Sequence, residues 1–303
     1  GKGVRLEYEG LFALGPLCGI DDRDAVRDAA SRCDALGLDV ISAGGTIAFA
    51  MECHATGLLP EAPAFGDAKG LLALLDAIAR RDGLGDLLAG GSRRAAAAIG
   101  GGSERFACHV KGLELPGYEP RALKAMALGL AVGTRGADHN RSGAYEEDFR
   151  AGSNRFRAST DKAVAVVEHE DRAALMDSLI LCKFLRGVFD DLADEGAAML
   201  RAVTGWEVTA EELRRTGARI VVARRLFNER EGWARAEDTL PPRFLEEALD
   251  ADGPAGGATL ARADLEAMVD AYYVARGLDA DGRVPPAQVR SLDLADVAPD
   301  AAT

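Results

Sequence analysis

The sequence lacks several features that mark large classes of protein. No C-x-x-C motif is present, so the chain has no usual sequence signature of a zinc or iron–sulfur site of its own. No run of 18 uninterrupted apolar residues occurs, and no membrane-spanning helix is predicted. The 36 basic residues are outnumbered by 49 acidic ones, giving a net charge of −13. A protein that binds the phosphate backbone of nucleic acids carries a basic footprint, so we expect no nucleic-acid partner.

Cysteine is scarce and irregularly spaced. The five cysteines are an odd number, and no two lie closer than 15 residues. This pattern argues against a disulfide framework and favours a reducing compartment. No leader with a charged and then an apolar region is visible, so we expect a cytoplasmic protein. Buried packing is the expected role of four of these thiols, Cys18, Cys33, Cys53 and Cys108.

Helical periodicity dominates what is present. Alternation with a period of two appears only in short pieces such as Phe106–Val110, so a mainly α fold is predicted. Aspartates that can cap helices and glycines that can end them punctuate the pattern. The expected helices are Arg23–Leu36, Thr46–Ala55, Leu71–Arg80, Ser92–Ile99, Arg121–Val132, Lys162–Val167, Arg172 to about Phe189, Leu213–Asn228 and Leu260–Ala275.

Two segments mark candidate boundaries. The segment Lys111–Arg121 (KGLELPGYEPR) is punctuated by proline and glycine between helical stretches. The segment Asp250–Thr259 (DADGPAGGAT) has the composition of a linker. We therefore expect a helical domain over residues 1–115 and a second over 116–303, with a short tail lobe after about residue 260.

Several motifs follow one another in an order that resembles a known family. They are LEYEGLFALGPLCGIDD, CDALGLDVISAGGTIAFAMECHATGLL, KGLELPGYEPR, RGADH, SLILCKF, GARIVVARRLFNEREG and EDTLPPRF. In this order and spacing they resemble the tungsten-dependent aldehyde ferredoxin oxidoreductase family. The resemblance implies two helical lobes similar to domains 2 and 3 of that family. A first, β-rich domain that cradles the cofactor in the family is not among these 303 residues.

The resemblance also implies chemistry. Family members hold tungsten or molybdenum through the dithiolenes of two pterins beside a 4Fe-4S cluster, and pass electrons from an aldehyde to ferredoxin. Both cofactors are expected here only together with the absent N-terminal domain or a partner subunit, and a homodimer is allowed for. The implied function is the C-terminal part of an oxidoreductase that converts small aldehydes to carboxylic acids.

Two D-x-x-G-L-[D/C] segments of the family each meet a pterin. The first is complete as Asp34, Gly37, Leu38 and Asp39, where carboxylates can accept hydrogen bonds from pterin N–H groups and glycine allows close approach. The second keeps Asp177, Leu181 and Cys182 but has Ile180 in place of glycine, which leaves close backbone approach there in question. An ordinary helix cap and loop is the alternative reading of the first segment.

Cys182 matches the fourth cluster ligand of the family, and the three other ligands would lie in the absent domain. A single thiolate cannot hold such a cluster. The other cysteines match no ligand position.

Further residues are assigned through the resemblance. Glu9 and His139 match the acid/base residues near the metal, a role that suits a carboxylate and an imidazole. We expect them to face one cleft and burial to raise the pKa of Glu9. Lys111, Glu114 and Arg121 match the segment around the cofactor, where cations can pair with phosphate or a substrate carboxylate and Glu114 can accept from pterin nitrogens. Interdomain salt bridges are the alternative for these three.

Two other functions stay open at this point. One keeps the cofactor and acts on another substrate, such as an aromatic acyl thioester, because a fold does not settle a reaction. The other is a cofactor-free helical scaffold or binding module descended from the enzyme.

Overall fold

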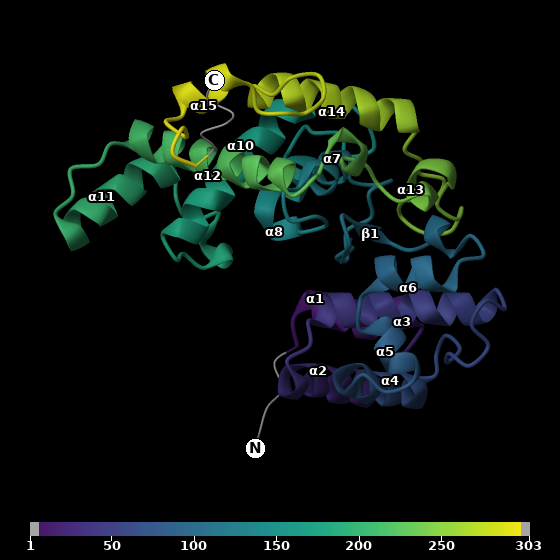
Figure 1. The fold of residues 1–303 in the computed structure, drawn as a ribbon. Coiled ribbons are helices and arrows are strands. Elements are labelled where there is room, and N and C mark those ends of the chain that lie inside the picture. Colours follow the sequence, from purple (N-terminus) through teal and green to yellow (C-terminus); the bar gives the residue numbers. More distant parts are fainter. Residues whose placement is uncertain (1–5, 298–303) are drawn as a thin grey trace. The chain divides into compact units, whose positions relative to one another are not determined.

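The computed structural model describes residues 6–297 and divides into two compact units, each considered by itself (Figure 1). Unit 1 comprises Gly1–Glu119 and Leu240–Glu247, and unit 2 comprises Pro120–Thr239 and Ala248–Thr303. The described part is helical apart from one two-stranded sheet. The predicted mainly α fold is confirmed.

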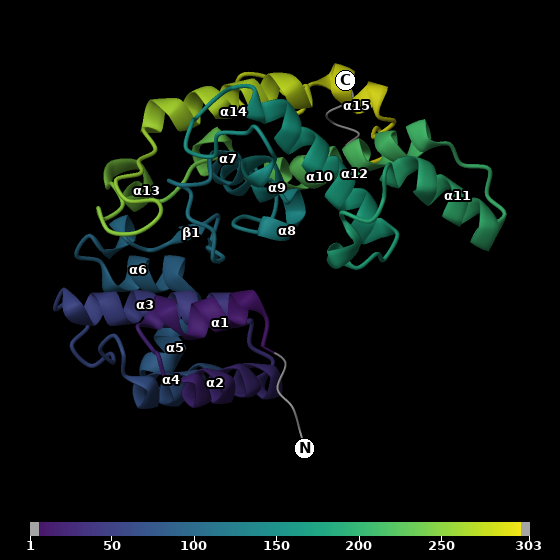
Figure 2. The same cartoon turned by 180° about the vertical axis from the view of Figure 1, so that it is seen from behind.

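Unit 1 is a two-layered helical domain. Seen from behind, α1 and α3 lie side by side, and α2 and α4 form a second layer (Figure 2). Its helices are α1 (Tyr8–Leu14), α2 (Arg23–Leu36), α3 (Val40–Ala55), α4 (Ala68–Arg80), α5 (Leu84–Leu88), α6 (Ser92–Ile99) and α13 (Pro242–Glu246), with short 3-10 turns at Pro16–Cys18 and Ser103–Arg105.

Capping explains one helix whose bounds were predicted and one whose start was not. Helix α2 has the predicted bounds, because Asp22 accepts from the amides of its first turn and Gly37 takes the left-handed conformation after its last. Helix α3 begins at Val40, six residues before the predicted start, because the Asp39 carboxylate accepts a hydrogen bond from the Ser42 amide at 2.8 Å.

Two consecutive glycines in α3 allow close packing on both sides of that helix. A Cβ on Gly44 would lie 2.4 Å from the Ala13 carbonyl oxygen of α1, and one on Gly45 would lie 3.0 Å from the side chain of Glu114. The glycine pair therefore sets how closely α1 and Glu114 approach α3.

The core of unit 1 holds the thiols expected there. Cys18, Cys33 and Cys53 are fully buried among Ile47, Leu75 and other apolar side chains. Burial raises the pKa of Cys18 to about 12 and those of Cys33 and Cys53 to about 11. These three thiols are packing residues, as predicted.

A small hairpin precedes the end of unit 1. Strands β1 (His109–Val110) and β2 (Leu113–Glu114) pair antiparallel, with Val110 opposite Leu113. The two residues between them, Lys111 and Gly112, have φ of 53° and 89°. Two positive φ values define the type I′ turn that matches the twist of a hairpin.

Helix α13 returns the chain to unit 1 from much later in the sequence. Arg243 donates to both carboxylate oxygens of Glu52 in α3, one of them at 2.8 Å. Arg105 and Glu246 form a second ion pair at 2.5 Å. A bidentate arginine–carboxylate pair fixes both distance and orientation, so it holds the returning segment in place.

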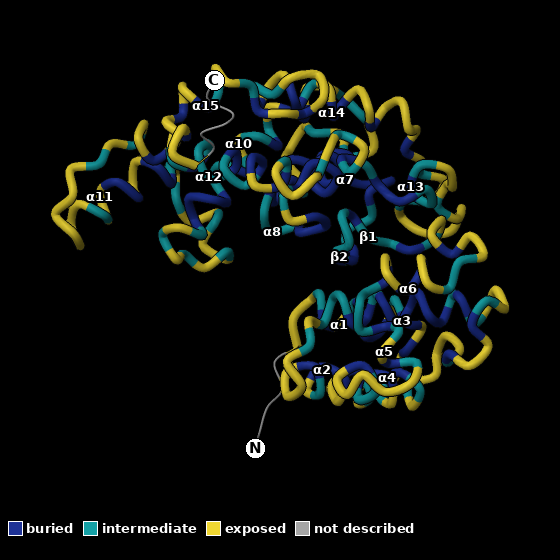
Figure 3. Tube along the Cα trace, viewed as in Figure 1, coloured by how far each residue is buried: buried dark blue, intermediate teal, exposed yellow. Residues whose placement is uncertain are grey.

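Unit 2 is built around a buried short helix. All nine residues of α7 are buried (Figure 3). This helix, α7, spans Lys124–Val132. The other helices are α8 (His139–Ser142), α9 (Tyr145–Phe149), α10 (Lys162–Ser178), α11 (Leu192–Thr204), α12 (Ala210–Arg230), α14 (Arg262–Arg276) and α15 (Pro286–Ser291). Short 3-10 turns occur at Lys183–Leu185 and Arg235–Glu237. Helix α10 packs on α7, α12 and α14.

Buried charges in unit 2 are paired. Asp148 accepts from the amides of Ala125 and Met126 at the start of α7 and from Lys162 at 3.0 Å. On α14, Arg276 donates to Glu170 of α10 at 2.8 Å. These two buried carboxylates thus each have a cation beside them.

The predicted helix from Arg172 to about Phe189 is wrong. Helix α10 joins it to the preceding predicted helix and ends at Ser178, because Ile180 takes the left-handed conformation and stops the helical hydrogen bonds. Helix α11 was not predicted, although Asp191 caps it by accepting from the amides of Ala193 and Asp194.

Within residues 6–297, no single helix combines the length and apolar composition of a membrane span. The pair α2 and α3 passes that test only jointly, with a bend of 119° between them.

Candidate functional site

The residues predicted for the site fall in both units, and the geometry of each unit is described separately. Unit 1 carries Glu9, Asp34, Gly37, Leu38, Asp39, Lys111 and Glu114, and unit 2 carries Arg121, His139, Asp177, Leu181 and Cys182. The shared cleft expected for Glu9 and His139 joins residues of different units and stays a prediction.

Glu9 lies in the first turn of α1 and is half-buried. Its carboxylate accepts a hydrogen bond from the Gly117 amide at 2.9 Å, while the neighbouring Tyr8 hydroxyl donates to the Gly117 carbonyl at 2.7 Å. Burial raises the pKa of Glu9, and the negative charge of Asp39 raises it further, although the Gly117 hydrogen bond opposes both. The predicted direction of the shift is confirmed.

The first D-x-x-G-L-D segment forms the tight connection between α2 and α3. Gly37 has φ of 69°, its amide donates to the Asp34 carbonyl, and the Leu38 amide donates to the Cys33 carbonyl at 2.8 Å. Asp34 and Asp39 are exposed, and a Cβ at Gly37 would meet nothing within 4 Å. The segment presents two carboxylates and an open stretch of backbone to solvent.

Glu114 is held by unit 1 itself. It is 2 % exposed, and one carboxylate oxygen accepts from the Ser92 amide at 2.7 Å, the Ser92 hydroxyl at 2.8 Å and the Thr46 hydroxyl at 3.3 Å. A carboxylate at the first amides of α6 also interacts favourably with the helix dipole. Lys111 occupies the turn of the adjacent hairpin, and Arg121 is buried near the start of unit 2.

His139 is the first residue of α8, directly after its cap. The Asp138 carboxylate accepts from the Asn140 amide at 2.9 Å, which fixes the start of the helix. Burial lowers the pKa of His139, and the charge of Arg186 lowers it further, against the opposing effect of Asp138. The imidazole is therefore neutral near pH 7 and can accept a proton.

The second segment repeats the backbone geometry of the first. Ile180 has φ of 57°, its amide donates to the Asp177 carbonyl at 3.1 Å, and the Leu181 amide donates to the Met176 carbonyl at 2.9 Å. These are the same two hydrogen bonds that close the Gly37 turn. The left-handed conformation is thus kept without glycine. At the position in this turn that corresponds to Gly37 in the first, the Ile180 side chain is present and 88 % exposed.

Arg141 connects the two candidate segments of unit 2. Its guanidinium donates to Asp177 at 2.5 Å and lies 3.3 Å from Asp138, the cap of the His139 helix. Lys183 approaches the other Asp177 oxygen at 2.9 Å. Both oxygens of Asp177 are paired with cations, whereas Asp34 and Asp39 are open to solvent.

Cys182 follows the second segment and is exposed, unlike the other four cysteines. Three apolar residues close to it in sequence are also exposed, namely Ile180, Phe184 and Val188. Among the described residues, no three histidines, cysteines or carboxylates are grouped as metal ligands. The described chain alone therefore does not fit a four-thiolate cluster, and Cys182 could supply only one ligand.

Sequence comparison decides the family. The family described as aldehyde ferredoxin oxidoreductase, domains 2 and 3, matches residues 1–294. The chain belongs to this family. It is 38 % identical to the tungsten-containing aldehyde ferredoxin oxidoreductase of Pyrococcus furiosus over 96 % of its length, and 37 % identical to that of Thermococcus kodakarensis, also over 96 %. In both cases it spans 48 % of the relative.

A structural comparison supports the fold. The active-site complex BamBC of benzoyl coenzyme A reductase, solved with 1,5-dienoyl-CoA, has a TM-score of 0.78 to this chain and 21 % sequence identity. The likeness covers 99 % of this chain and 51 % of that one. This chain and the matched half of that neighbour thus share one helical architecture.

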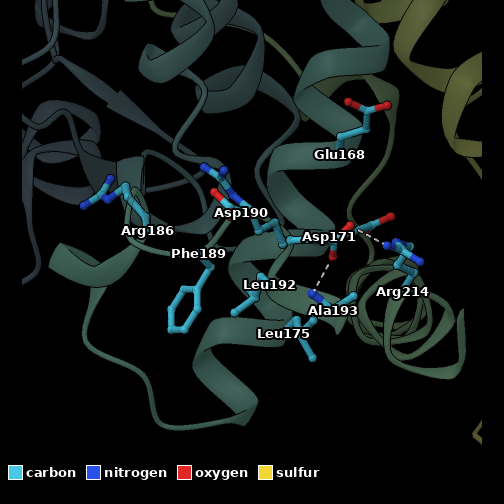
Figure 4. Close-up of a pocket in the computed structure, with 11 residues that line it drawn as sticks. Glu168, Asp171, Leu175, Arg186, Phe189, Asp190, Leu192, Ala193 and Arg214 are labelled. Carbon is cyan, nitrogen blue, oxygen red and sulfur yellow. Dashed lines mark hydrogen bonds and ion pairs between the residues drawn. The ribbon is translucent and has the colours of Figure 1, made fainter. Parts of the chain in front are cut away.

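Unit 2 contains a cavity that the sequence did not predict. It has a volume of about 370 Å³ and lies among α10, α11 and α12 (Figure 4). Three arginines and four carboxylates line it beside Leu175, Phe189 and Leu192. Its charges are largely matched within the unit, as for Arg214 and Asp191 at 2.5 Å. No site residue predicted from the family motifs lies in its lining.

Two positions of the site were missed at the level of sequence. Arg141 lies two residues after the RGADH motif and three after Asp138, a spacing that places two helical residues on one face. Asp138 precedes the short helix as a typical N-cap. Spacing alone could have linked this pair, but nothing in it indicated the contact with Asp177, 36 residues further along.

Proposed function

We propose that this chain is the C-terminal half of a tungsten–pterin oxidoreductase that oxidises a small aldehyde to a carboxylic acid. In the balanced reaction, aldehyde and water give the acid, two protons and two electrons, and two ferredoxin molecules each take one electron. The observation that carries the proposal is the family match over residues 1–294 together with two motif segments of one backbone geometry.

The hydrogen-bond acceptors of unit 1 suit a pterin. A pterin presents amino and ring N–H groups, and the exposed Asp34 and Asp39 carboxylates are acceptors for them. The space next to Gly37 admits a flat ring against the backbone. In unit 2 the carboxylate of Asp177 is held by Arg141 and Lys183, and the Leu181 amide donates to Met176, so that segment offers the cofactor mainly the Leu181 carbonyl.

The tungsten centre, when bound, supplies the two-electron acceptor. The chain supplies groups that can hold a proton released as the aldehyde is oxidised. Glu9 has a raised pKa, so its carboxylate is a better proton acceptor than an exposed glutamate. His139 is neutral near pH 7 and offers a second acceptor. We propose that both face the substrate.

The 4Fe-4S cluster belongs to the proposal only with the other half of the enzyme. Three ligands would come from the part of the relatives that this chain does not span, and Cys182 would be the fourth. The exposure of Cys182 in a segment where Phe184 and Val188 are also exposed supports this assignment. The proposed partners are that other half, ferredoxin and a second copy of the enzyme.

The test is co-expression of the chain with a polypeptide that matches the first half of its relatives. We expect stoichiometric tungsten, cluster absorption and aldehyde-dependent reduction of ferredoxin. An aromatic acyl thioester offered with reduced ferredoxin is the second substrate arm. Metal-loaded protein active only on the thioester would replace the aldehyde proposal, and protein that never takes up tungsten would support the scaffold alternative.

A further inference from the structure

Three arginines surround a second, smaller cavity in unit 2. The cavity has a volume of about 280 Å³ and is formed by the segment after α7, by α8 and by α12. Its lining comprises Thr134, Arg135, Arg141, Arg224, Phe227 and Asn228. No carboxylate contributes to the lining, which distinguishes it from the larger cavity of unit 2.

Two of the three arginines already have partners. Arg135 lies 2.5 Å from Asp138, and Arg141 bridges Asp138 and Asp177. Arg224 differs from both, because within residues 6–297 it forms no hydrogen bond or ion pair. It is half-buried in α12, and burial together with the charge of Arg141 lowers the pKa of its guanidinium. A cation is thus held partly away from water with no carboxylate at ion-pair distance, although the charges of Asp177, Glu170 and Asp138 reach it.

The local charge is positive although the chain as a whole is strongly acidic. Four cations, Arg135, Arg141, Arg224 and Lys183, surround only two carboxylates, Asp138 and Asp177. The further carboxylate whose charge reaches Arg224 is Glu170, and it pairs at 2.8 Å with Arg276, which also pairs with Asp171 at 2.5 Å. A chain with a net charge of −13 keeps two cations in excess at this cavity. An anion in the cavity would remove that imbalance.

The geometry also indicates the form of the ligand. A guanidinium without a protein partner offers paired N–H groups that match the oxygens of a phosphate or carboxylate. Phe227 lines the same cavity and is 54 % exposed, and the Arg230 guanidinium lies 5.0 Å from the centre of its ring. An apolar surface next to a cationic wall suits a ligand with an anionic head and a short apolar or aromatic body. A cavity of this size is at the small end of ligand sites, so a dinucleotide would not fit.

We propose that this cavity is an oxyanion site, in which Arg224 binds the phosphate or carboxylate head of a small organic ligand and Phe227 contacts its body. The site is complete within unit 2. It does not depend on the oxidoreductase function proposed above, because the anion can bind without any cofactor in the protein.

The experiment uses the 303-residue chain and three probes. Phenyl phosphate, methyl phosphate and benzoate are titrated by isothermal calorimetry at low salt. We expect saturable binding of an aromatic oxyanion that weakens as sodium chloride is added. Tighter binding of phenyl phosphate assigns a phosphate head, and tighter binding of benzoate assigns a carboxylate. Absence of saturable binding for all three overturns the proposal.

Variants make the test specific to the cavity. Arg224→Gln should weaken binding roughly tenfold or more, since it removes a charge-assisted hydrogen-bond donor. Phe227→Leu should remove the preference for phenyl over methyl phosphate. Arg215→Gln deletes the same charge nine residues earlier on α12, outside the cavity, and should leave affinity unchanged. Equal weakening by Arg215→Gln and Arg224→Gln would show only a general charge effect and contradict the site.

A stability measurement guards against misfolding. Because Arg224 has no protein partner, Arg224→Gln should unfold at a melting temperature equal to or above that of the parent chain. The parent should gain thermal stability from the bound probe, and the variant should not. A variant that melts lower without ligand would show that Arg224 has a structural role instead.

Discussion

The guanidinium of Arg141 lies 2.5 Å from the carboxylate of Asp177 and 3.3 Å from that of Asp138. This one side chain joins the cap of the His139 helix to the end of α10, where the second motif segment begins. The segment that carries His139 and the segment that begins at Asp177 are therefore connected by ion pairs and not only by their order in the sequence. Removing Arg141 should disturb both ends of the network.

Arg141→Gln should lower the free energy of unfolding by about 0.5–1 kcal/mol, because the pairs it forms are only partly buried. Urea unfolding followed by circular dichroism measures the change. Arg201→Gln is the matched control, since Arg201 forms an exposed pair with Glu207 and its removal should cost less. Equal losses in the two variants would contradict a network role for Arg141.

Substitutions of the left-handed residue should change the free energy of unfolding in opposite directions in the two motif segments. Ile180→Gly should stabilise the chain by about 0.5–1 kcal/mol, because relief of a left-handed strain of about 1–2 kcal/mol exceeds the entropic cost of glycine. Ile180→Ala keeps the strain and should be close to neutral. Chemical denaturation of both variants measures their free energies of unfolding. Equal changes in the two variants would show that the conformation carries no strain.

Gly37→Ala should have the opposite effect on the first segment. The backbone there has φ of 69°, so alanine adds strain even though its Cβ would meet nothing within 4 Å. We expect a loss of about 0.5–1 kcal/mol in the free energy of unfolding. An unchanged stability would mean that the turn relaxes out of the left-handed region.

The raised pKa of Glu9 predicts how stability depends on pH. A carboxyl whose folded pKa lies above its unfolded value stabilises the fold when protonated, and that contribution is lost as pH rises from the unfolded value toward the folded one. Glu9→Gln should therefore be at least as stable as the parent chain at pH 7. Urea unfolding from pH 4 to 8 should show the advantage of the variant shrinking toward acid. An advantage that grows toward acid would contradict the shift.

Breaking the buried ion pair between Arg276 and Glu170 in unit 2 should lower the free energy of unfolding far more than breaking a surface pair. Arg276 and Glu170 are each 4 % exposed at the side chain, and Tyr272 also donates to Glu170 at 2.6 Å. Arg276→Met leaves a buried carboxylate without its cation and should cost roughly 3–5 kcal/mol. The double variant Arg276→Met with Glu170→Leu should recover part of that loss. Thermal unfolding of the three chains provides the measurement.

The sequence predicted those parts of the fold that depend on neighbouring residues. The bounds of α2 and α6 followed from apolar spacing and terminal glycines. The end of α10 did not, because an isoleucine takes the conformation usually left to glycine. Contacts between residues far apart in the sequence could not be predicted from spacing either. The hydrogen bond from the Ser92 amide to Glu114 and the Arg141–Asp177 pair exist only once the chain has folded.

Turnover at equal tungsten content is the most direct test of the proposed function. The enzyme reassembled with its other half is compared as the parent, Glu9→Gln and Glu61→Gln, an exposed glutamate of the same unit serving as the control. If Glu9 holds the proton released from the substrate, Glu9→Gln should lower aldehyde oxidation by roughly 10²–10⁴-fold, while Glu61→Gln keeps the parent rate. Full turnover of Glu9→Gln at full tungsten loading would contradict the account.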